Sequence, residues 1–180
     1  MNLSSLDVVR GRIFIFGDNI DTDQIYPGRY LELTEPGDIA THVMEGADAS
    51  FPSKVKVGDI IVAGKNFGCG SSREHAVITL QAAGIKAVVA KSFARIFYRN
   101  AINRGLCVIE VPGLDFSKIQ DGLTANIDVR NGKISFSNGY ELSFVPFSEH
   151  ILDILAAGGV IPLYKAKMKG RWRKAFSFHG

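Results

Sequence analysis

Cysteine is scarce in this sequence, and long apolar runs are missing. The two cysteines, Cys69 and Cys107, have a spacing that fits neither a zinc site nor a disulfide framework. An iron–sulfur cluster held by this chain alone is also not expected, because such clusters usually take roughly three or four cysteine ligands. No apolar stretch is long enough to cross a bilayer. We therefore expect a cytoplasmic protein that has no metal or cofactor ligands of its own.

Internal repeats and low-complexity linkers are absent as well, so we expect a single domain over residues 1–164 of the 180-residue chain. Residues 165–180 contain six basic side chains and no acid: Lys165, Lys167, Lys169, Arg171, Arg173 and Lys174. Such a basic tail can bind nucleic acid or a membrane, but it is more often a solvated end or a subunit-contact arm. The rest of the chain has 15 basic and 18 acidic residues and no basic stripe, which disfavours nucleic-acid binding.

Apolar segments alternate with helical periodicity in the first two thirds of the chain. The pattern predicts strands at 12–16, 59–63, 85–90 and 106–111, with helices at 72–83 and 92–104. Continuously apolar strands joined by helices form right-handed parallel crossovers. Ligands bind at the carboxyl ends of such strands, and residues 65–73 fall at that edge.

The pattern changes after Pro112. Short strands are predicted at 124–130, 133–136 and 141–144, followed by a helix at 148–157. The dipeptides Asn131-Gly132 and Asn138-Gly139 lie between these strands and favour type I′ hairpin turns. The chain is therefore predicted to be an α/β protein with a parallel sheet flanked by helices and an antiparallel β layer.

The segment Asp18–Pro27 is polar and lacks a period, so it is predicted to be a surface loop. Asp21 and Asp23 in it are compatible with a metal site, an Asx turn or a helix cap, and the sequence does not choose between them. A helix start is predicted at 36–43 and a connecting loop at 48–56.

A glycine-rich turn precedes the helix at 72–83. Gly64, Gly68 and Gly70 allow unusual dihedrals and a close approach of ligand to backbone. Ser71 and Glu74 have the spacing of a capping box, which would aim the helix amides at an anion above Ser71. Arg73 adds a fixed positive charge. A good helix start with no ligand explains this stretch about equally well.

Three motifs carry a resemblance to a known family. They are DNIDTDQIYPGRYL at 18–31, GKNFGCGSSREHA at 64–76 and KSFARIFYRNAINRGL at 91–106. They resemble the signatures of the small subunit, or swivelling domain, of the aconitase superfamily, and within it those of the isopropylmalate dehydratases. The match runs over roughly residues 10–165 in the family's order. It implies a swivelling β/β/α domain, which agrees with the pattern of strands and helices.

The resemblance implies a hydro-lyase that isomerises a hydroxy di- or tricarboxylate. In this family a four-iron four-sulfur cluster on a large subunit binds the substrate hydroxyl, so we expect such a partner in a heterodimer or heterotetramer. Carried over by motif, Ser71 is the catalytic base, Arg73 holds a substrate carboxylate and Ser72 donates to the same anion. Asp23 matches a polar active-site position with an orienting role, and a purely structural role is about as compatible with its position.

The resemblance also places substrate contacts at Arg29, Tyr30, Leu31, Glu32 and Leu33. Members that act on tricarboxylates tend to carry an arginine here, whereas Glu32 would repel a third carboxylate. Leu31 and Leu33 suit an isopropyl group. We therefore expect 2-isopropylmalate as substrate, with homoaconitate, citrate or dimethylmalate chemistry as alternatives.

Two other classes of function remain open. A serine hydrolase is disfavoured because Gly70-Ser71-Ser72 is not the G-x-S-x-G elbow. A non-enzymatic anion-binding module is compatible with the glycine turn, although P-loop and Rossmann fingerprints are missing. Several other residues are predicted to be structural, in caps, the core, salt bridges or a partner surface: Cys69, His75, Arg95, Arg99 and Arg104.

Overall fold

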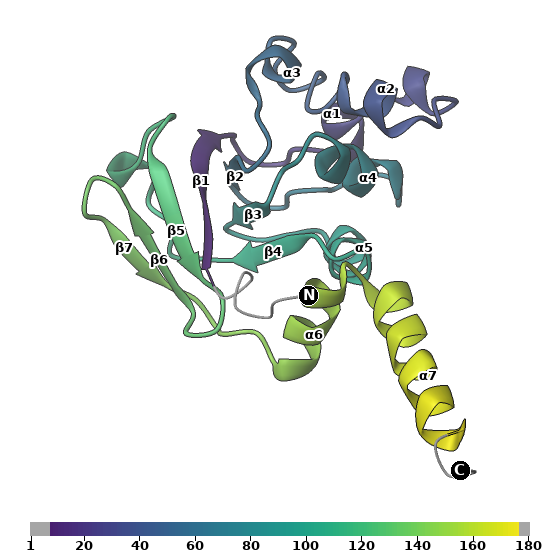
Figure 1. Cartoon of the computed structure of the whole chain (residues 1–180). Coiled ribbons are helices and arrows are strands. Elements are labelled where there is room, and N and C mark those ends of the chain that lie inside the picture. The colour runs from purple at the N-terminus through teal and green to yellow at the C-terminus, as the bar shows by residue number, and fades with distance from the viewer. Residues whose placement is uncertain (1–7, 177–180) are drawn as a thin grey trace.

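The computed structural model describes residues 8–176, with side chains up to Lys169. Seven strands form one curled sheet in the order β4-β3-β2-β1-β5-β6-β7 (Figure 1). Strand β1 (Val8–Ile15) joins its two halves, because residues 8–12 pair antiparallel with β5 and residues 13–15 pair parallel with β2. The predicted α/β class is confirmed, and the predicted parallel and antiparallel parts are halves of one sheet.

The parallel half consists of β2 (Ile60–Ala63), β3 (Ala87–Ala90) and β4 (Cys107–Glu110). Helix α4 (His75–Ala82) connects β2 to β3, and α5 (Arg95–Asn103) connects β3 to β4. Every residue of β2 and β3 is buried, which explains their continuous apolar sequence. The helices lie on the side of the parallel strands away from β5–β7 (Figure 1).

The antiparallel half consists of β5 (Thr124–Asp128), β6 (Lys133–Phe136) and β7 (Glu141–Ser143). Both hairpins are confirmed, but their predicted type I′ turns are wrong. A type I′ turn needs positive φ at both central residues, and in the described chain Gly132 and Gly139 have it while the asparagines before them do not. The side chains explain this, since Asp128 Oδ1 accepts from Asn131 N at 2.9 Å and Asn138 Oδ1 accepts from Tyr140 N at 3.1 Å.

Two segments predicted to be loops contain helical turns. Residues 18–27 include α1 (Thr22–Ile25), and a 3₁₀ turn follows at Gly28–Tyr30. Residues 48–56 include α3 (Phe51–Lys54), and the predicted helix start appears as α2 (Pro36–Ala40). The loop predictions failed here because buried apolar side chains within the polar segments anchor them to the body of the protein. Phe51 is fully buried, with its ring centroid 5.0 Å from that of Phe14.

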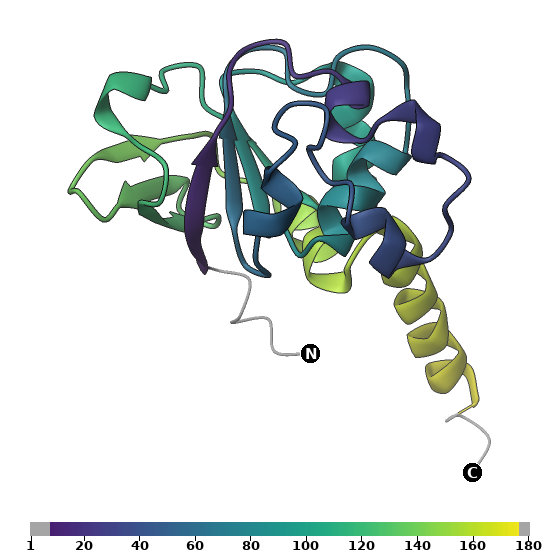
Figure 2. The same ribbon diagram turned by 90° about the horizontal axis from the view of Figure 1, so that it is seen from above.

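The chain ends in two helices, after a 3₁₀ turn at Phe116–Lys118 that leads into the antiparallel half. Helix α6 (Glu149–Ala157), predicted at 148–157, is capped by Ser148 and closed by the left-handed Gly158. Helix α7 (Val160–Phe176) runs across the expected domain boundary between residues 164 and 165 and extends away from the body (Figure 2). Residues 177–180 and the side chains of the tail from Gly170 onward lie outside the description. No helix within residues 8–176 combines the length and apolarity needed to span a membrane.

Candidate active site

Two loops lie side by side beyond the ends of β1 and β2. Asn19 N donates to Lys65 O at 2.8 Å, Gly68 N to Ile20 O at 2.7 Å and Thr22 N to Cys69 O at 2.9 Å. These bonds extend the parallel pairing of the strands past the sheet edge. As a result, the start of α1 lies against the turn that contains Ser71.

Two of the three glycines in this turn serve packing within the protein. A Cβ on Gly64 would lie 1.9 Å from Asp18 Oδ1, and one on Gly68 would lie 2.2 Å from the Phe97 ring. Close packing therefore explains Gly64 and Gly68 without the expected approach of a ligand to the backbone. Gly70, with φ of +94°, has its nearest non-adjacent atom, Thr22 Oγ1, at 3.4 Å from such a Cβ and keeps the turn open.

The predicted capping box at Ser71 and Glu74 is wrong. Helix α4 begins at His75, and its N-cap, Glu74, makes no side-chain cap bond. Arg73 N instead donates to Ser71 O at 2.7 Å in a tight turn, and the Val77 amide donates to Glu74 O at 3.0 Å. A capping box does form at α1, where Asp21 caps the helix and Gln24 reaches back.

The Ser71 side chain therefore does not cap α4 and is available for another role. Ser71 and Ser72 are exposed and line a cavity of about 470 Å³, a size typical of small-ligand sites. Arg73 lies on the same wall, and the other wall comes from α5 with Arg95, Ile96 and Arg99. The remaining lining residues are Thr22, Gly68, Gly70, Ala94, Phe97 and Asn100.

Thr22 is the closest polar neighbour of the Ser71 hydroxyl that the structure records. Thr22 Oγ1 lies 3.3 Å from Ser71 Oγ and donates to Ser71 O at 3.1 Å. Its side chain is held in place by burial, with 3% of the residue exposed. Sequence reasoning missed Thr22, although it sits between the two aspartates of the 18–27 segment. It fixes both the backbone and the hydroxyl of Ser71.

Asp23 and Arg73 form an ion pair across the two loops. Asp23 Oδ1 also accepts from Gly28 N at 3.2 Å, so the carboxylate joins α1, the following turn and Arg73. A Cβ on Gly28 would lie 3.0 Å from Arg73 Nη1, which shows how closely the backbone passes the guanidinium. The pair thus fixes Arg73 at the edge of the cavity.

Arg29 and Tyr30, two of the expected substrate contacts, bind Glu45 instead. This carboxylate pairs with Arg29, accepts from Tyr30 Oη at 3.0 Å and lies 2.6 Å from His42 Nδ1. The Tyr30 ring stacks on His42 with centroids 3.5 Å apart. Hydrogen bonding, first from His42 and then from Tyr30 and Arg29, lowers the pKa of Glu45 below its ordinary value.

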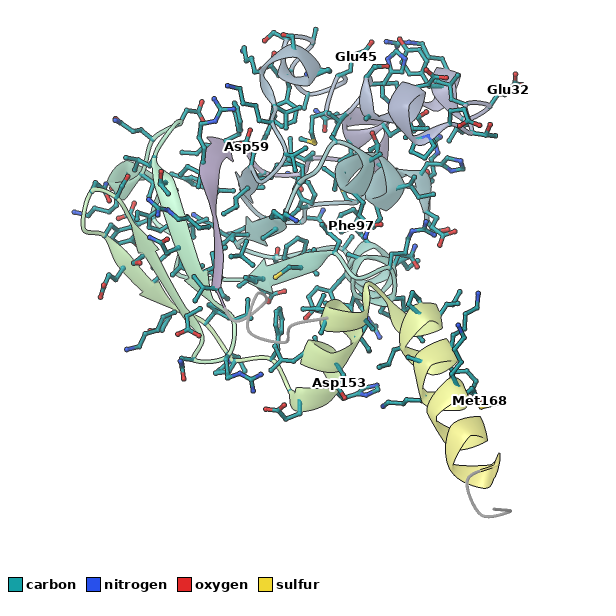
Figure 3. The ribbon with its side chains drawn as sticks, viewed as in Figure 1. Glu32, Glu45, Asp59, Phe97, Asp153 and Met168 are labelled. Carbon is teal, nitrogen blue, oxygen red and sulfur yellow. The ribbon has the colours of Figure 1, made fainter. Side chains whose placement is uncertain are left out.

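The expected contacts Leu31, Glu32 and Leu33 do not line the cavity that contains Ser71. The two leucines are half-buried, and Glu32 is exposed. In Figure 3 Glu32 lies at the outer edge of the molecule, far from Phe97, which lines the cavity. Gly28, directly before this segment, passes beside Arg73.

Two of the remaining candidates, His75 and Arg104, have structural partners. His75 stacks on Tyr26, and Arg104 pairs with Glu74 at 2.8 Å. Burial raises the pKa of Cys69, and it raises the pKa of Cys107 to about 12, so both sulfurs are thiols near neutral pH. Within residues 8–176 no three or more His, Cys, Asp or Glu side chains come together as a metal-binding group.

A model of the aconitase C-terminal domain matches residues 19–113, more than half of the chain. The chain belongs to the aconitase C-terminal domain family. The matched segment of this aconitase-type chain holds the paired loops, the Ser71 turn and α5, which together form the cavity.

Curated relatives of this aconitase-type chain carry dehydratase names. The 3-isopropylmalate dehydratase small subunit 1 of Methanopyrus kandleri is 56% identical, over 88% of this chain and 94% of that protein. The methanogen homoaconitase small subunit of Methanothermobacter thermautotrophicus is 51% identical, over 87% and 91%. The crystal structure of 3-isopropylmalate dehydratase from Methanocaldococcus jannaschii matches with a TM-score of 0.86 at 48% identity, covering 93% of this chain and 99% of that one.

Proposed function

We propose that this chain is the small subunit of a 3-isopropylmalate dehydratase, which interconverts 2- and 3-isopropylmalate in leucine biosynthesis in the cytoplasm. The relatives' names support the reaction class, a hydro-lyase. The observation that carries the assignment of residues is the open cavity with Ser71, Ser72 and Arg73 on one wall, where Asp23 holds Arg73.

The proposal requires a large subunit that carries the metal cofactor. This chain supplies two cysteines, both thiols and far apart in the sequence, so its own side chains do not fit a cluster. A four-iron four-sulfur cluster on the large subunit would supply the Lewis acid for the departing hydroxyl group. The large subunit would cover the cavity from the side that this chain leaves open.

Ser71 is the proposed base that takes a proton from the carbon next to the hydroxyl-bearing carbon. An isolated serine hydroxyl is far too weakly acidic near neutral pH, so its alkoxide needs strong electrostatic support. Because the Ala76 and Val77 amides in the first turn of α4 already bond to backbone carbonyls, and the Thr22 hydroxyl donates to Ser71 O, we expect that support from Arg73 on the same wall of the cavity. Exclusion of water by the partner would strengthen this interaction.

Arg73 and Ser72 are the proposed ligands of a substrate carboxylate. The guanidinium has a planar fork of donors that matches a carboxylate, and Asp23 sets its direction. Ser72 is exposed on the same wall of the cavity and can donate to the same anion. These two residues would orient the dicarboxylate so that its reacting C–H bond faces Ser71.

Substrate choice is the part of the proposal with a competing candidate. A homoaconitase small subunit is 51% identical to this chain, close to the 56% of the isopropylmalate relative. Isopropylmalate is favoured because Glu45 already neutralises Arg29 and because Glu32 is an acid, so the segment at 29–33 offers no free cation to a third carboxylate. Leu31 and Leu33 keep their proposed role of facing the isopropyl group once the large subunit binds.

Reconstitution tests the proposal. The chain is purified alone and mixed under anaerobic conditions with the large dehydratase subunit of the same organism. Turnover is then measured on 2-isopropylmalate, homoaconitate, citrate and dimethylmalate. We expect the lone chain to be inactive and the mixture to isomerise 2-isopropylmalate at least about ten-fold better than the others, as expressed by kcat/KM. A preference for homoaconitate would make the chain a homoaconitase subunit, and inactivity on all four would leave an anion-binding module.

A further inference from the structure

Two arginines on α5 have no partner in the described part of the chain. The side chains of Arg95 and Arg99 form neither a hydrogen bond nor an ion pair with any residue between 8 and 169. Five other arginines do have a carboxylate partner: Arg12, Arg29, Arg73, Arg104 and Arg130. The α5 arginines are thus free charges that the fold of this chain does not explain.

Their location is unfavourable for the isolated chain. Arg95 is the first residue of α5 and Arg99 lies one turn further on, whereas the positive end of a helix dipole favours acidic side chains. The first turn of α5 contains no acid, and its N-cap, Ala94, provides no side-chain cap. This electrostatic cost would be offset if an anionic group met the arginines from outside.

The shape of the surface favours a protein over a small anion. Both arginines line the cavity with Ser71, and both also line a second hollow of about 240 Å³ with Phe93, Tyr98 and Glu110. They therefore lie on the ridge between two hollows. Ile96, next to Arg95 on the same ridge, has 55% of its surface exposed. A hydroxy dicarboxylate in one hollow would leave this apolar side chain and the other hollow uncovered, whereas a protein surface can cover both.

We infer that Arg95, Ile96 and Arg99 form the docking ridge for the cluster-bearing large subunit. The partner's surface would present Asp or Glu carboxylates to the two guanidiniums and an apolar side chain to Ile96. The ridge borders the Ser71 cavity directly, so a partner seated on it would also close that cavity. This inference rests on the proposed function for the identity of the partner, and it assigns the two arginines to assembly rather than to substrate binding.

The test separates assembly from substrate binding. The double variant Arg95→Glu/Arg99→Glu is titrated against the large subunit, and the apparent Kd is obtained from activity and from isothermal titration calorimetry. We expect the Kd to rise about ten-fold or more, because charge reversal places like charges opposite each other. The calorimetric titration is run without substrate, so that weaker association is measured separately from any effect on turnover of charges that line the Ser71 cavity.

Two controls accompany the variant. Lys133→Glu reverses an exposed charge on β6, away from the ridge, and should leave the Kd unchanged. Arg95→Lys/Arg99→Lys keeps the charge and should shift the Kd much less than the glutamate pair. Circular dichroism melts of the lone chains confirm that each variant folds.

An unchanged Kd for the large subunit, measured without substrate, would overturn the inference. The outcome is independent of the substrate assignment. If the wild-type pair assembles through the ridge but acts on none of the four acids, the ridge stands and the proposed function fails.

Discussion

The two halves of the sheet differ in how they bury their residues and in what lies at their ends. In the parallel half, β2 and β3 are buried along their whole length, and their carboxyl ends lead into the loops around Ser71. In the antiparallel half, β5 alternates between buried and half-buried residues, and its turns are held by Asp128 and Asn138. The parallel half therefore positions the candidate chemistry, and the antiparallel half contributes stability and shape.

This division follows from the strand connections. Parallel strands need long crossovers, which provide the loops and helix starts that can carry Ser71, Arg73 and α5. Hairpin turns of a few residues have little room for a site. Strand β1 belongs to both halves and holds them together. The comparison can be tested by substitutions placed in the two halves.

The largest expected effect among these tests comes from Arg73→Lys in the parallel half. Lysine keeps the charge but loses the planar fork that pairs with Asp23 and would hold a carboxylate, so kcat/KM should fall by about 100-fold. The measurement is steady-state isomerisation by the reconstituted pair. Arg104→Lys, at the end of α5 and paired with Glu74, is the control and should stay within about two-fold. Equal losses in the two variants would contradict a special role for Arg73.

A smaller loss is expected for Gly28→Ala. The added methyl group would lie 3.0 Å from Arg73 Nη1, and the flexible side chain should move aside at little cost in stability. Misplacing the guanidinium by a fraction of an ångström should lower kcat/KM by about ten-fold. Gly37→Ala is the matched control, because a Cβ there meets no atom within 4 Å. If both alanine variants are fully active, the close approach of the backbone to Arg73 has no functional meaning.

The smallest effect on activity is expected from Ile127→Ala in the antiparallel half. Ile127 is fully buried in β5, so the cavity left by the shorter alanine side chain should lower the free energy of unfolding by about 2–5 kcal/mol. Well below the melting temperature, kcat and KM should match the wild type. Denaturant unfolding and kinetics on the same sample check both parts, with the milder Ile127→Val alongside. A loss of kcat in a folded sample would show that the antiparallel half also shapes the site.

The strands were predictable from the sequence because burial on both faces leaves a continuous apolar signal. The edges of β2 and β3 agree with the prediction to within about two residues. Hairpin positions were equally clear, but the turn type depended on side-chain bonds from Asp128 and Asn138 that a dipeptide rule does not include. The helical character of residues 165–176 was missed, since charge composition says little about conformation in a basic segment.

The candidate site was predictable in its residues but not in its geometry. Ser71, Ser72 and Arg73 were found through a motif. Their position outside α4, which begins at His75, depends on the pairing of the loops that follow β1 and β2. Arg95 and Arg99 were assigned to salt bridges or a partner surface because helical spacing does not show which wall they face, and the structure places both beside the Ser71 cavity.

The account depends most on Ser71 as the group that takes the proton from carbon. The direct test is rapid mixing of the reconstituted Ser71→Ala pair with 2-isopropylmalate, following the unsaturated diacid by its ultraviolet absorbance. Calorimetry on the same sample measures binding of the substrate and of the large subunit. We predict that both bind within about three-fold of the wild type, while the unsaturated diacid forms at least about 100-fold more slowly. Formation of the diacid at the wild-type rate would contradict the assignment.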